Sequence, residues 1–491
     1  MFQTTARQIA ETTGGSLVGG ASGDETVTGE ARIDSRAVEP GDLFAAFAGE
    51  HVDGHDYLAA ASAAGAALAL VTRDDVGMPA VRVADVQQAL SDLAREQIER
   101  ARAAAEPPVV LAVTGSAGKT STKDLLGLVL SGIGPTIAPA GSFNNELGLP
   151  LTVLRLTPDT RFLVLEMGAR GVGHIRHLTD IARPDISLVL NVGSAHLGEF
   201  GSVEAIARAK GELVEALPAT GRAVLNAEDP RVAAMASRTE APVVTWGLSS
   251  GDVRGEQLDL DAEARITFTL TVPEGLTRLD GSAVPAGSVP VRPDLLGEHQ
   301  AGNVLAALTG ALLAGAEPAA AAAALEGATL ASGQRMEAER AGDVLVINDA
   351  YNANPDAMRL ALKTLAHLGR GHRTIAVLGE MRELGPDSAR LHDEIGRLAV
   401  RLNISQLYVV GEGAAPMHHG ASLEGSFGGE SEYLDTVEEA LAVLERTVAP
   451  GDVVLLKSSR DAGLRQLARP LLEHLAQDAG PQRPSDGGEQ G

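Results

Sequence analysis

The stretch VTGSAGKTSTKD (residues 113–124) comes directly after the apolar run PPVVLA (107–112). An apolar strand that passes through a glycine-containing loop into Lys-Thr and a helix is typical of phosphate-binding loops. In such a loop the backbone N–H groups point at phosphate oxygens, Lys119 supplies a positive charge, and Thr120 offers a hydroxyl to Mg²⁺. The segment predicts an ATP-binding loop made of Gly115, Ser116, Ala117, Gly118, Lys119, Thr120 and Ser121.

This segment alone also allows a second interpretation, a tight strand-to-helix turn with an incidental lysine. Val113 stands where the full Walker spacing would have its first glycine. The position of the loop favours phosphate binding, because it lies at the carboxyl end of a predicted strand, where α/β sheets bind ligands.

The flanking chain alternates buried strands with helices from residue 109 onward, as in RFLVLEMGA (161–169) and ISLVLNVG (186–193). Residues 242–297 have alternating strands and polar turns, which predict an antiparallel flap or a second sheet in the same domain. The pattern indicates a central P-loop-type ATPase domain with a mainly parallel sheet, over residues 108–332.

Shorter α/β patterns flank this unit on both sides. Residues 1–107 predict a small N-terminal α/β domain that ends in a helix over 86–106, just before Pro107-Pro108. Residues 333–476 again alternate strand and helix and predict a second doubly wound, Rossmann-like domain, with helices starting at Pro355 and Pro386. The last segment, 477–491, has the composition of a disordered tail.

Composition narrows the class of protein. A chain of 491 residues with 44% apolar residues is long enough for about three domains. A formal net charge of −25 argues against nucleic acid as a partner. The absence of cysteine excludes disulfides and Cys-ligated metals and fits the cytoplasm. The start resembles no signal peptide, and no stretch reaches the roughly 18 to 20 apolar residues of a membrane span, so we expect no membrane insertion.

Three further polar residues follow the predicted strands of the central domain. Glu166 ends RFLVLE and His196 follows ISLVLNVGSA, so both could converge on a metal beside the phosphates. Taken singly, each could equally be a helix N-cap carboxylate or a loop histidine bonded to backbone. Lys210 lies in a helix that begins soon after His196, where a lysine is ordinarily a solvated surface charge.

Many segments occur here in the same order as in the Mur ligases, a family of ATP-dependent amide ligases. They are TGSAGKTSTK, NNELGLPLTVL, LEMGARGVGHI, NVGSAHLGEFGS, ARAKGEL, LLGEHQAGNVLAA, NDAYNANP, LGEMRELG and KSSR. The chain resembles this family from about residue 30 to about residue 465. The segments at 34–57 and 348–357 resemble most the members that add a dipeptide.

The resemblance implies an ATP-dependent, ADP-forming ligase that adds D-alanyl-D-alanine to UDP-N-acetylmuramoyl-tripeptide through an acyl phosphate. The product would be the pentapeptide precursor of peptidoglycan, made in the cytoplasm by a monomer. The N-terminal domain (1–107) would bind the UDP-muropeptide, the central domain (108–332) ATP, and the C-terminal domain (333–476) would close over both.

The resemblance also implies roles for individual residues. Thr120 and Glu166 would hold one Mg²⁺, while His196 and Lys210, carbamylated by CO₂, would hold a second. Together with Lys119 these are the expected catalytic residues. Other matching residues are Asn303 for adenine, Arg335 and Asp349 for ATP phosphate and ribose, Ser35 and Arg36 for the uridine diphosphate, Asn144 and Asn145 for the muropeptide channel, and Tyr351, Asn352 and Asn354 for closure around the dipeptide.

Several of these residues also have structural alternatives. Arg335 could be a solvated linker residue, Tyr351 and Asn352 could build a turn, and Asp349 could cap the helix at Pro355. The chain departs from the family pattern at Gln300, at Ser458 and in the loop SGQRME (332–337), and the Ser458 change weakens any expectation for Lys457 and Arg460.

Three other functions stay open at this point. One is another amide ligase of the family, adding a diamino acid or, like folylpolyglutamate synthase, glutamate. The second is an inert or regulatory ATP-binding subunit of the same fold. The third is a P-loop kinase or switch, against which the segment at 34–57 argues.

Overall fold

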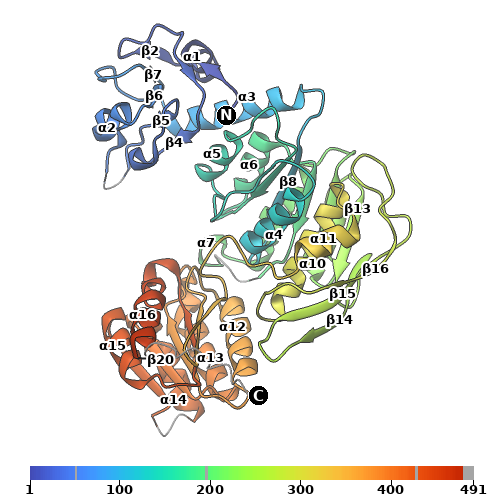
Figure 1. Ribbon diagram of the computed structural model, residues 1–491, viewed down its shortest axis with the longest axis vertical. Coiled ribbons are helices and arrows are strands. Elements are labelled where there is room, and N and C mark those ends of the chain that lie inside the picture. The colour runs from blue at the N-terminus through green and yellow to red at the C-terminus, as the bar shows by residue number, and fades with distance from the viewer. Residues whose placement is uncertain (50–51, 194–196, 426–428, 479–491) are drawn as a thin grey trace, which may run out of the picture.

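The computed structural model describes residues 1–49, 52–193, 197–425 and 429–478. The predicted metal ligand His196 and residues 479–491 of the predicted tail lie outside the described residues. Three α/β domains follow one another along the chain, each built on its own sheet (Figure 1). The predicted fold class is confirmed. None of the described helices is both long and apolar enough to cross a bilayer.

The N-terminal domain has a five-stranded sheet in the order β2-β7-β6-β5-β4, in which only β2 is antiparallel to its neighbour. Its strands are β2 (Ser16–Val18), β4 (Ala31–Arg32), β5 (Leu43–Ala45), β6 (Leu68–Val71) and β7 (Ala80–Arg82). A separate antiparallel pair joins β1 (Thr4–Thr5) to β3 (Thr26–Val27). The helices are α1 (Ala6–Thr13) and α2 (Leu58–Ala63).

Helix α3 (Val86–Arg102) connects this domain to the next one. The Asp85 side chain caps its start by accepting a hydrogen bond from the Gln88 N–H. The helix packs on α1 and also on α5 and α6 of the central domain, in one continuous apolar core. It ends four residues before the predicted end at 106, because residues 102–106 contribute no apolar side chain to that core.

The central domain has a nine-stranded sheet in the order β16-β15-β14-β13-β12-β11-β8-β10-β9. The strands from β9 to β14 run parallel, while β15 and β16 are antiparallel. The strands are β8 (Val109–Thr114), β9 (Thr136–Ile137), β10 (Phe162–Glu166), β11 (Ile186–Val189), β12 (Arg222–Asn226), β13 (Val243–Gly247), β14 (Val253–Leu260), β15 (Ile266–Val272) and β16 (Gly287–Val291).

Residues 242–297 therefore form neither a flap nor a second sheet. They extend the main sheet, since β13 pairs in parallel with both β12 and β14. The predicted antiparallel strands are present at this end. In β15, buried and half-buried residues alternate because α10 packs there with Phe268 and Leu270 in one core, which buries one face.

Two layers of helices cover the central sheet. Helices α4 and α10 pack with one face, and α5, α6 and α8 pack with the other. The helices of this domain are α4 (Lys119–Ser131), α5 (Gly148–Val153), α6 (His174–Ala182), α7 (Leu197–Phe200), α8 (Val203–Glu215), α9 (Pro230–Ala233), α10 (His299–Leu313) and α11 (Pro318–Ala324).

The C-terminal domain has a six-stranded sheet in the order β17-β18-β22-β19-β20-β21, parallel except for β17. Its strands are β17 (Glu337–Ala341), β18 (Val344–Asn348), β19 (Thr374–Gly379), β20 (Gln406–Val410), β21 (Ser431–Leu434) and β22 (Val453–Lys457). Its helices are α12 (Pro355–Leu368), α13 (Ser388–Arg401), α14 (Ala415–Glu424), α15 (Val437–Thr447) and α16 (Ala468–Asp478).

Two predicted limits in this domain are wrong by two residues. The helix expected from Pro386 begins at Ser388, because a 3₁₀ turn over Gly385–Asp387 precedes it. Helix α16 continues to Asp478, so residues 477 and 478 are helical and do not belong to a disordered tail. The apolar residues Ala468, Leu471, Leu472 and Leu475 of this helix pack into the domain core.

Candidate active site

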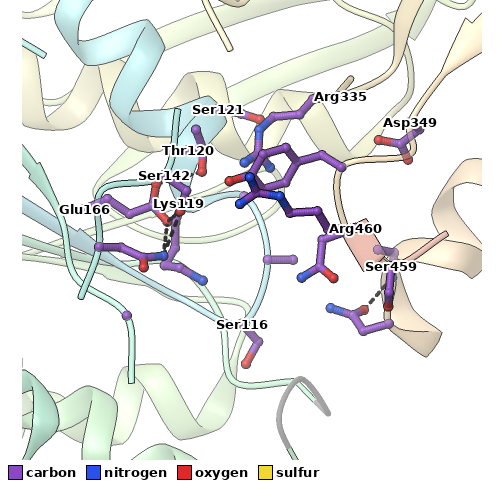
Figure 2. Close-up of a pocket in the computed structure, with 18 of the residues that line it drawn as sticks. Ser116, Lys119, Thr120, Ser121, Ser142, Glu166, Arg335, Asp349, Ser459 and Arg460 are labelled. Atoms are coloured by element: carbon purple, nitrogen blue, oxygen red, sulfur yellow. Dashed lines mark hydrogen bonds between the residues drawn. The ribbon is translucent and has the colours of Figure 1, made fainter. Parts of the chain in front are cut away.

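A cavity of about 890 Å³ lies between the central and C-terminal domains (Figure 2). The loops that follow β8 and β10 form its central-domain side, and the loops that follow β18, β19 and β22 form the other. Because carboxyl ends of strands from both sheets meet here, the cavity lies where doubly wound folds bind ligands. The predicted residues that line it are Ser116, Ala117, Gly118, Lys119, Thr120, Ser121, Asn144, Asn145, Glu166, Lys210, Asn303, Arg335, Asp349, Tyr351, Asn352 and Asn354.

The loop between β8 and α4 turns at Gly118 into the N-terminus of α4. Gly118 has φ +82°, and a Cβ atom there would come within 2.1 Å of Asn303 Oδ1, so only glycine fits. Asn191, at the end of the run ISLVLN, accepts hydrogen bonds from the N–H groups of Ser116 and Ala117, each at 2.9 Å. In the sequence, nothing marks Asn191 as a site residue except its position after a buried strand.

Lys119 begins α4, and its ammonium donates to the Gly115 carbonyl at 2.9 Å. Desolvation by the surrounding protein lowers the pKa of Lys119; the charge of Glu166 opposes this, and that of Arg335 adds to it. A desolvated ammonium at the N-terminus of a helix is stabilised by a nearby negative charge, and an anionic phosphate would supply that charge.

Glu166, the last residue of β10, is 2% exposed and accepts hydrogen bonds on both carboxylate oxygens. The Thr120 hydroxyl donates to Oε2 at 2.6 Å, and Ser142 Oγ and Asn144 Nδ2 each donate to Oε1 at 2.7 Å. Glu166 caps no helix, so that alternative is wrong. Asn144, expected in the muropeptide channel, thus contacts Glu166, as does Ser142, which no sequence motif singles out.

The oxygen donors around Glu166 fit a magnesium ion. Mg²⁺ prefers oxygen ligands and is typically held by one or two carboxylates, with waters and substrate phosphates completing the shell. Within the described part of the chain, no three His, Cys, Asp or Glu side chains gather as a metal cluster. An ion beside Thr120 and Glu166 would therefore depend on the nucleotide for the rest of its ligands.

Lys210 lies on α8 and is 4% exposed, which rules out the solvated surface lysine. Desolvation, and next the positive charge of Lys119, hold the pKa of Lys210 well below its usual range. The lowered pKa favours the neutral amine, the form that can act as a nucleophile. A buried amine that lines the same cavity as the phosphate loop fits the chemistry of carbamate formation with CO₂.

Three predicted residues of the C-terminal domain are brought together opposite the phosphate loop. The guanidinium of Arg335 lies over the ring of Tyr351, with 4.0 Å from its central carbon to the ring centroid, so it is no free linker residue. Asp349 Oδ2 accepts a hydrogen bond from Lys457 Nζ at 2.6 Å. The same ammonium donates to the Asn352 carbonyl at 3.0 Å, so Lys457 fixes the 349–352 loop.

Two predicted asparagines have structural contacts. Asn354 Oδ1 accepts from the Ala357 N–H at 2.9 Å and caps α12, so Asp349 is not the cap of this helix. Asn145 Oδ1 accepts from the Gly148 N–H at 2.9 Å, at the start of α5. Both residues line the cavity while their side-chain oxygens hold a helix end.

The departures from the family pattern also have local explanations. Gln300 is 2% exposed, and its carbonyl oxygen accepts from Asn303 Nδ2 at 2.9 Å, which orients the predicted adenine contact. Ser458 is fully buried against Gly379, where a Cβ atom would lie 2.8 Å from that of Ser458. In the SGQRME loop, Gln334 and Met336 flank Arg335 with positive φ angles of 61° and 53°.

Ser35 and Arg36 lie apart from this cavity, in a 3₁₀ turn of the N-terminal domain. The Arg36 guanidinium donates to Asp34 at 2.7 Å, and its hydrogen bonds lower the pKa of Asp34 to about 2. The structure therefore does not bring the predicted uridine contacts to the predicted ATP site.

The fold and the site define a three-domain ATP-dependent ligase. Its parts are a P-loop, a buried carboxylate hydrogen-bonded to the threonine of that loop, and a Rossmann-like domain that faces both. Three family models match this chain: the Mur ligase middle domain over 113–311, the Mur ligase, glutamate ligase domain over 334–460, and the Mur ligase family, catalytic domain over 30–98. The chain belongs to the Mur ligase family, whose members are ATP-dependent ligases, and it uses ATP.

Its relatives point to one branch of the family. The UDP-N-acetylmuramoyl-tripeptide–D-alanyl-D-alanine ligase of Mycobacterium tuberculosis is 45% identical over 515 residues, covering 96% of this chain and 98% of the relative. The ligase of that name from Escherichia coli is 32% identical over 482 residues, covering 96% and 99%.

Solved structures of the same branch also match this chain. MurF from Acinetobacter baumannii matches with a TM-score of 0.83 at 31% identity, covering 96% of this chain and 99% of that one. MurF ligase from Thermotoga maritima in complex with ADP matches with a TM-score of 0.76 at 27% identity, covering 92% and 99%.

Proposed function

We propose that this chain joins D-alanyl-D-alanine to UDP-N-acetylmuramoyl-tripeptide with conversion of ATP to ADP, giving the UDP-linked pentapeptide precursor of peptidoglycan. The observation that carries the proposal is the single cavity that holds the phosphate loop, Glu166 and the Asp349 loop together. The names of the relatives supply the two substrates.

The chemistry requires activation of a carboxylate. A carboxylate is a poor electrophile because its charge is delocalised, whereas an acyl phosphate has a good leaving group. Lys119 and the free N–H groups at the N-terminus of α4 would hold the γ-phosphoryl group while it moves to the carboxylate, the step with the largest electrostatic demand. The dipeptide amine would then attack the acyl carbon and release phosphate.

Two Mg²⁺ ions complete the proposed site and, when bound, neutralise charge on the phosphates. Thr120 and Glu166 would hold the first. Lys210, as a CO₂-derived carbamate, would hold the second with His196, which lies outside the described residues. The burial of Lys210 and its lowered pKa support carbamylation, because they favour the neutral amine and only that form attacks CO₂.

The remaining roles follow the same division of labour. Asn303 would contact adenine, Arg335 and Asp349 the phosphates and ribose, and Tyr351, Asn352 and Asn354 would take part in closure. Closure would exclude water, which would otherwise hydrolyse the acyl phosphate. Asn144 and Asn145 would line the path of the peptide.

We also propose the domain limits 1–107 and 108–332 and a third domain from 333 to the end of α16 at Asp478, with Ser35 and Arg36 of the first domain at the uridine diphosphate. An ATP-consuming reaction on a uridine-nucleotide carrier favours the cytoplasm. A monomer without nucleic-acid partners or membrane insertion fits the strongly acidic composition.

An acceptor screen tests this function. ADP formation would be measured with ATP, Mg²⁺ and the UDP-tripeptide, adding D-alanyl-D-alanine, D-alanine, glutamate or a diamino acid in turn. We expect ADP to form with the dipeptide and only slowly with the single amino acids. Turnover with a single amino acid but not with the dipeptide would indicate another amide ligase of the family, and no turnover with any acceptor would indicate an inert subunit.

A further inference from the structure

The acceptor of the proposed reaction carries a second charged group besides its amine. A dipeptide ends in a carboxylate that takes no part in the chemistry. Two extended residues span at most about 7 Å, so this carboxylate must bind in the same cavity as the reacting amine. A group that recognises it would distinguish a dipeptide from a single amino acid, whose carboxylate lies closer to the amine.

Three arginines line the C-terminal-domain side of the cavity: Arg382, Arg460 and Arg465. Arg382 is already engaged, with its guanidinium 3.2 Å from Glu380 and 3.7 Å from Asp461. Arg460 and Arg465 form no ion pair with any carboxylate of the described chain. Such unpaired guanidiniums beside a substrate cavity are suited to bind an anion.

Arg460 stands on a rigid base. The preceding residues Lys457, Ser458 and Ser459 are all at most 4% exposed, whereas Arg460 is exposed. The Ser459 hydroxyl accepts from the Arg382 N–H at 2.9 Å, which ties this loop to the loop after β19. Figure 2 shows the Arg460 side chain extending into the cavity from the side of Ser459 toward the phosphate loop.

Cations other than Arg460 already line the proposed phosphate site. On the central-domain side, Lys119 and the N-terminus of α4 face the cavity, and Arg335 adds a cation at its edge. Arg460 belongs to the loop after β22, in the other domain. A dipeptide held at this arginine by its carboxylate would extend across the cavity, with its amine free to face the phosphate loop.

We propose that Arg460 binds the C-terminal carboxylate of the acceptor dipeptide and so selects a dipeptide over a single amino acid. This inference rests on the proposed function. It assigns to Arg460 a role in orienting the acceptor: the guanidinium can form two parallel hydrogen bonds to the carboxylate, which fixes the direction of the chain and of its amine.

The test crosses two changes, one in the protein and one in the substrate. Initial rates would be measured with D-alanyl-D-alanine and with D-alanyl-D-alanine amide, which lacks the carboxylate charge, for the wild-type enzyme and for Arg460→Gln. For the wild type we expect the amide to have a kcat/KM about 10- to 100-fold lower, the range of a charge-assisted hydrogen bond. For Arg460→Gln the two acceptors should have nearly equal kcat/KM.

Two further variants sharpen the result. Arg460→Lys keeps the charge and should recover part of the preference for the free carboxylate over the amide. Arg465→Gln removes a neighbouring unpaired arginine and should keep the wild-type ratio of the two kcat/KM values. The KM values for ATP and the UDP-tripeptide should stay within about 2-fold in Arg460→Gln, which would also show that the variant is folded.

The alternatives give different results. An unchanged preference for the free carboxylate over the amide in Arg460→Gln would overturn the proposal, since the arginine would then not bind the carboxylate. A raised KM for ATP in its place would also overturn it, since the arginine would then bind the nucleotide. Loss of the preference in Arg465→Gln alone would also overturn it. A wild-type enzyme inactive with the dipeptide would refute the proposed function itself, which is a separate outcome.

Discussion

Lys457 and Asp349 form a buried ion pair, with 2.6 Å between Nζ and Oδ2, that joins the ends of two neighbouring strands of the C-terminal domain. The lysine side chain is 2% exposed and the aspartate side chain 15%. The other carboxylate oxygen of Asp349 accepts from the Met336 N–H at 3.1 Å, next to Arg335. The pair therefore positions two loops that face the phosphate site.

Removing one partner of this pair should be costly. Lys457→Met leaves the Asp349 charge without its partner, and we expect the C-terminal domain to lose about 3 to 5 kcal/mol of stability. The Lys457→Met, Asp349→Asn double variant leaves no unpaired charge and should recover part of that loss. Thermal unfolding of the three proteins gives the comparison, and a double variant no more stable than Lys457→Met would contradict this account of the pair.

Lys119→Ala should abolish phosphoryl transfer. The variant loses the cation that faces the γ-phosphate, so we expect ADP formation to fall by at least about 10³-fold. Binding of the UDP-tripeptide, measured by calorimetry, should stay within a few-fold, because the proposed uridine contacts Ser35 and Arg36 lie in another domain. Near-normal turnover would exclude the role assigned to Lys119.

The sequence was sufficient for the order of the three α/β domains and for the strand and helix that flank the glycine loop, because buried parallel strands are continuous apolar runs. It could not show which side chains from distant loops converge. Ser142 and Asn191 are ordinary loop residues in the sequence, and only the folded chain places them on Glu166 and on the phosphate loop.

Buried charges were the least predictable part. Lys123 and Asp124 follow the phosphate loop and read as solvated residues of a helix, yet both side chains are 2% exposed. Lys123 donates to the Gly141 carbonyl at 3.0 Å, and Asp124 accepts from the Ser332 N–H at 2.8 Å. These partners lie far away in the sequence, so no local pattern reveals them.

Lys210→Ala should be inactive and open to chemical rescue. The alanine leaves space where the carbamate would lie, and a short carboxylate such as formate or acetate can occupy it as an oxygen ligand. We expect added carboxylate to restore part of the ADP formation in Lys210→Ala but none in Lys119→Ala. Full activity of Lys210→Ala without any additive would end the carbamate proposal.

His299 should make stability depend on pH between 6.5 and 4. Burial lowers its pKa from 6.5 to about 4, and its Nδ1 has no hydrogen-bond partner within the described chain. Below pH 6.5 the unfolded chain binds a proton that the folded chain rejects, so stability falls as pH falls, by about 3 kcal/mol in all. Above pH 6.5 both states are neutral and the effect is absent.

Glutamine at this position cannot take up the proton. In His299→Gln we therefore expect the free energy of unfolding to fall less steeply over this pH range than in the wild type. The difference between the two slopes should correspond to at most one bound proton. Denaturant unfolding at several pH values measures both slopes. Equal slopes in the two proteins would show that the folded chain protonates His299 as readily as the unfolded chain does, which would contradict the lowered pKa.

The central claim, transfer of the γ-phosphoryl group to the peptide carboxylate, has one direct test. The UDP-tripeptide would be prepared with ¹⁸O in the carboxylate that becomes the new amide, and the released phosphate analysed by mass spectrometry. An acyl phosphate requires that oxygen to leave with phosphorus, so we predict one ¹⁸O atom in each phosphate released. Phosphate free of ¹⁸O, formed together with the pentapeptide, would contradict the account.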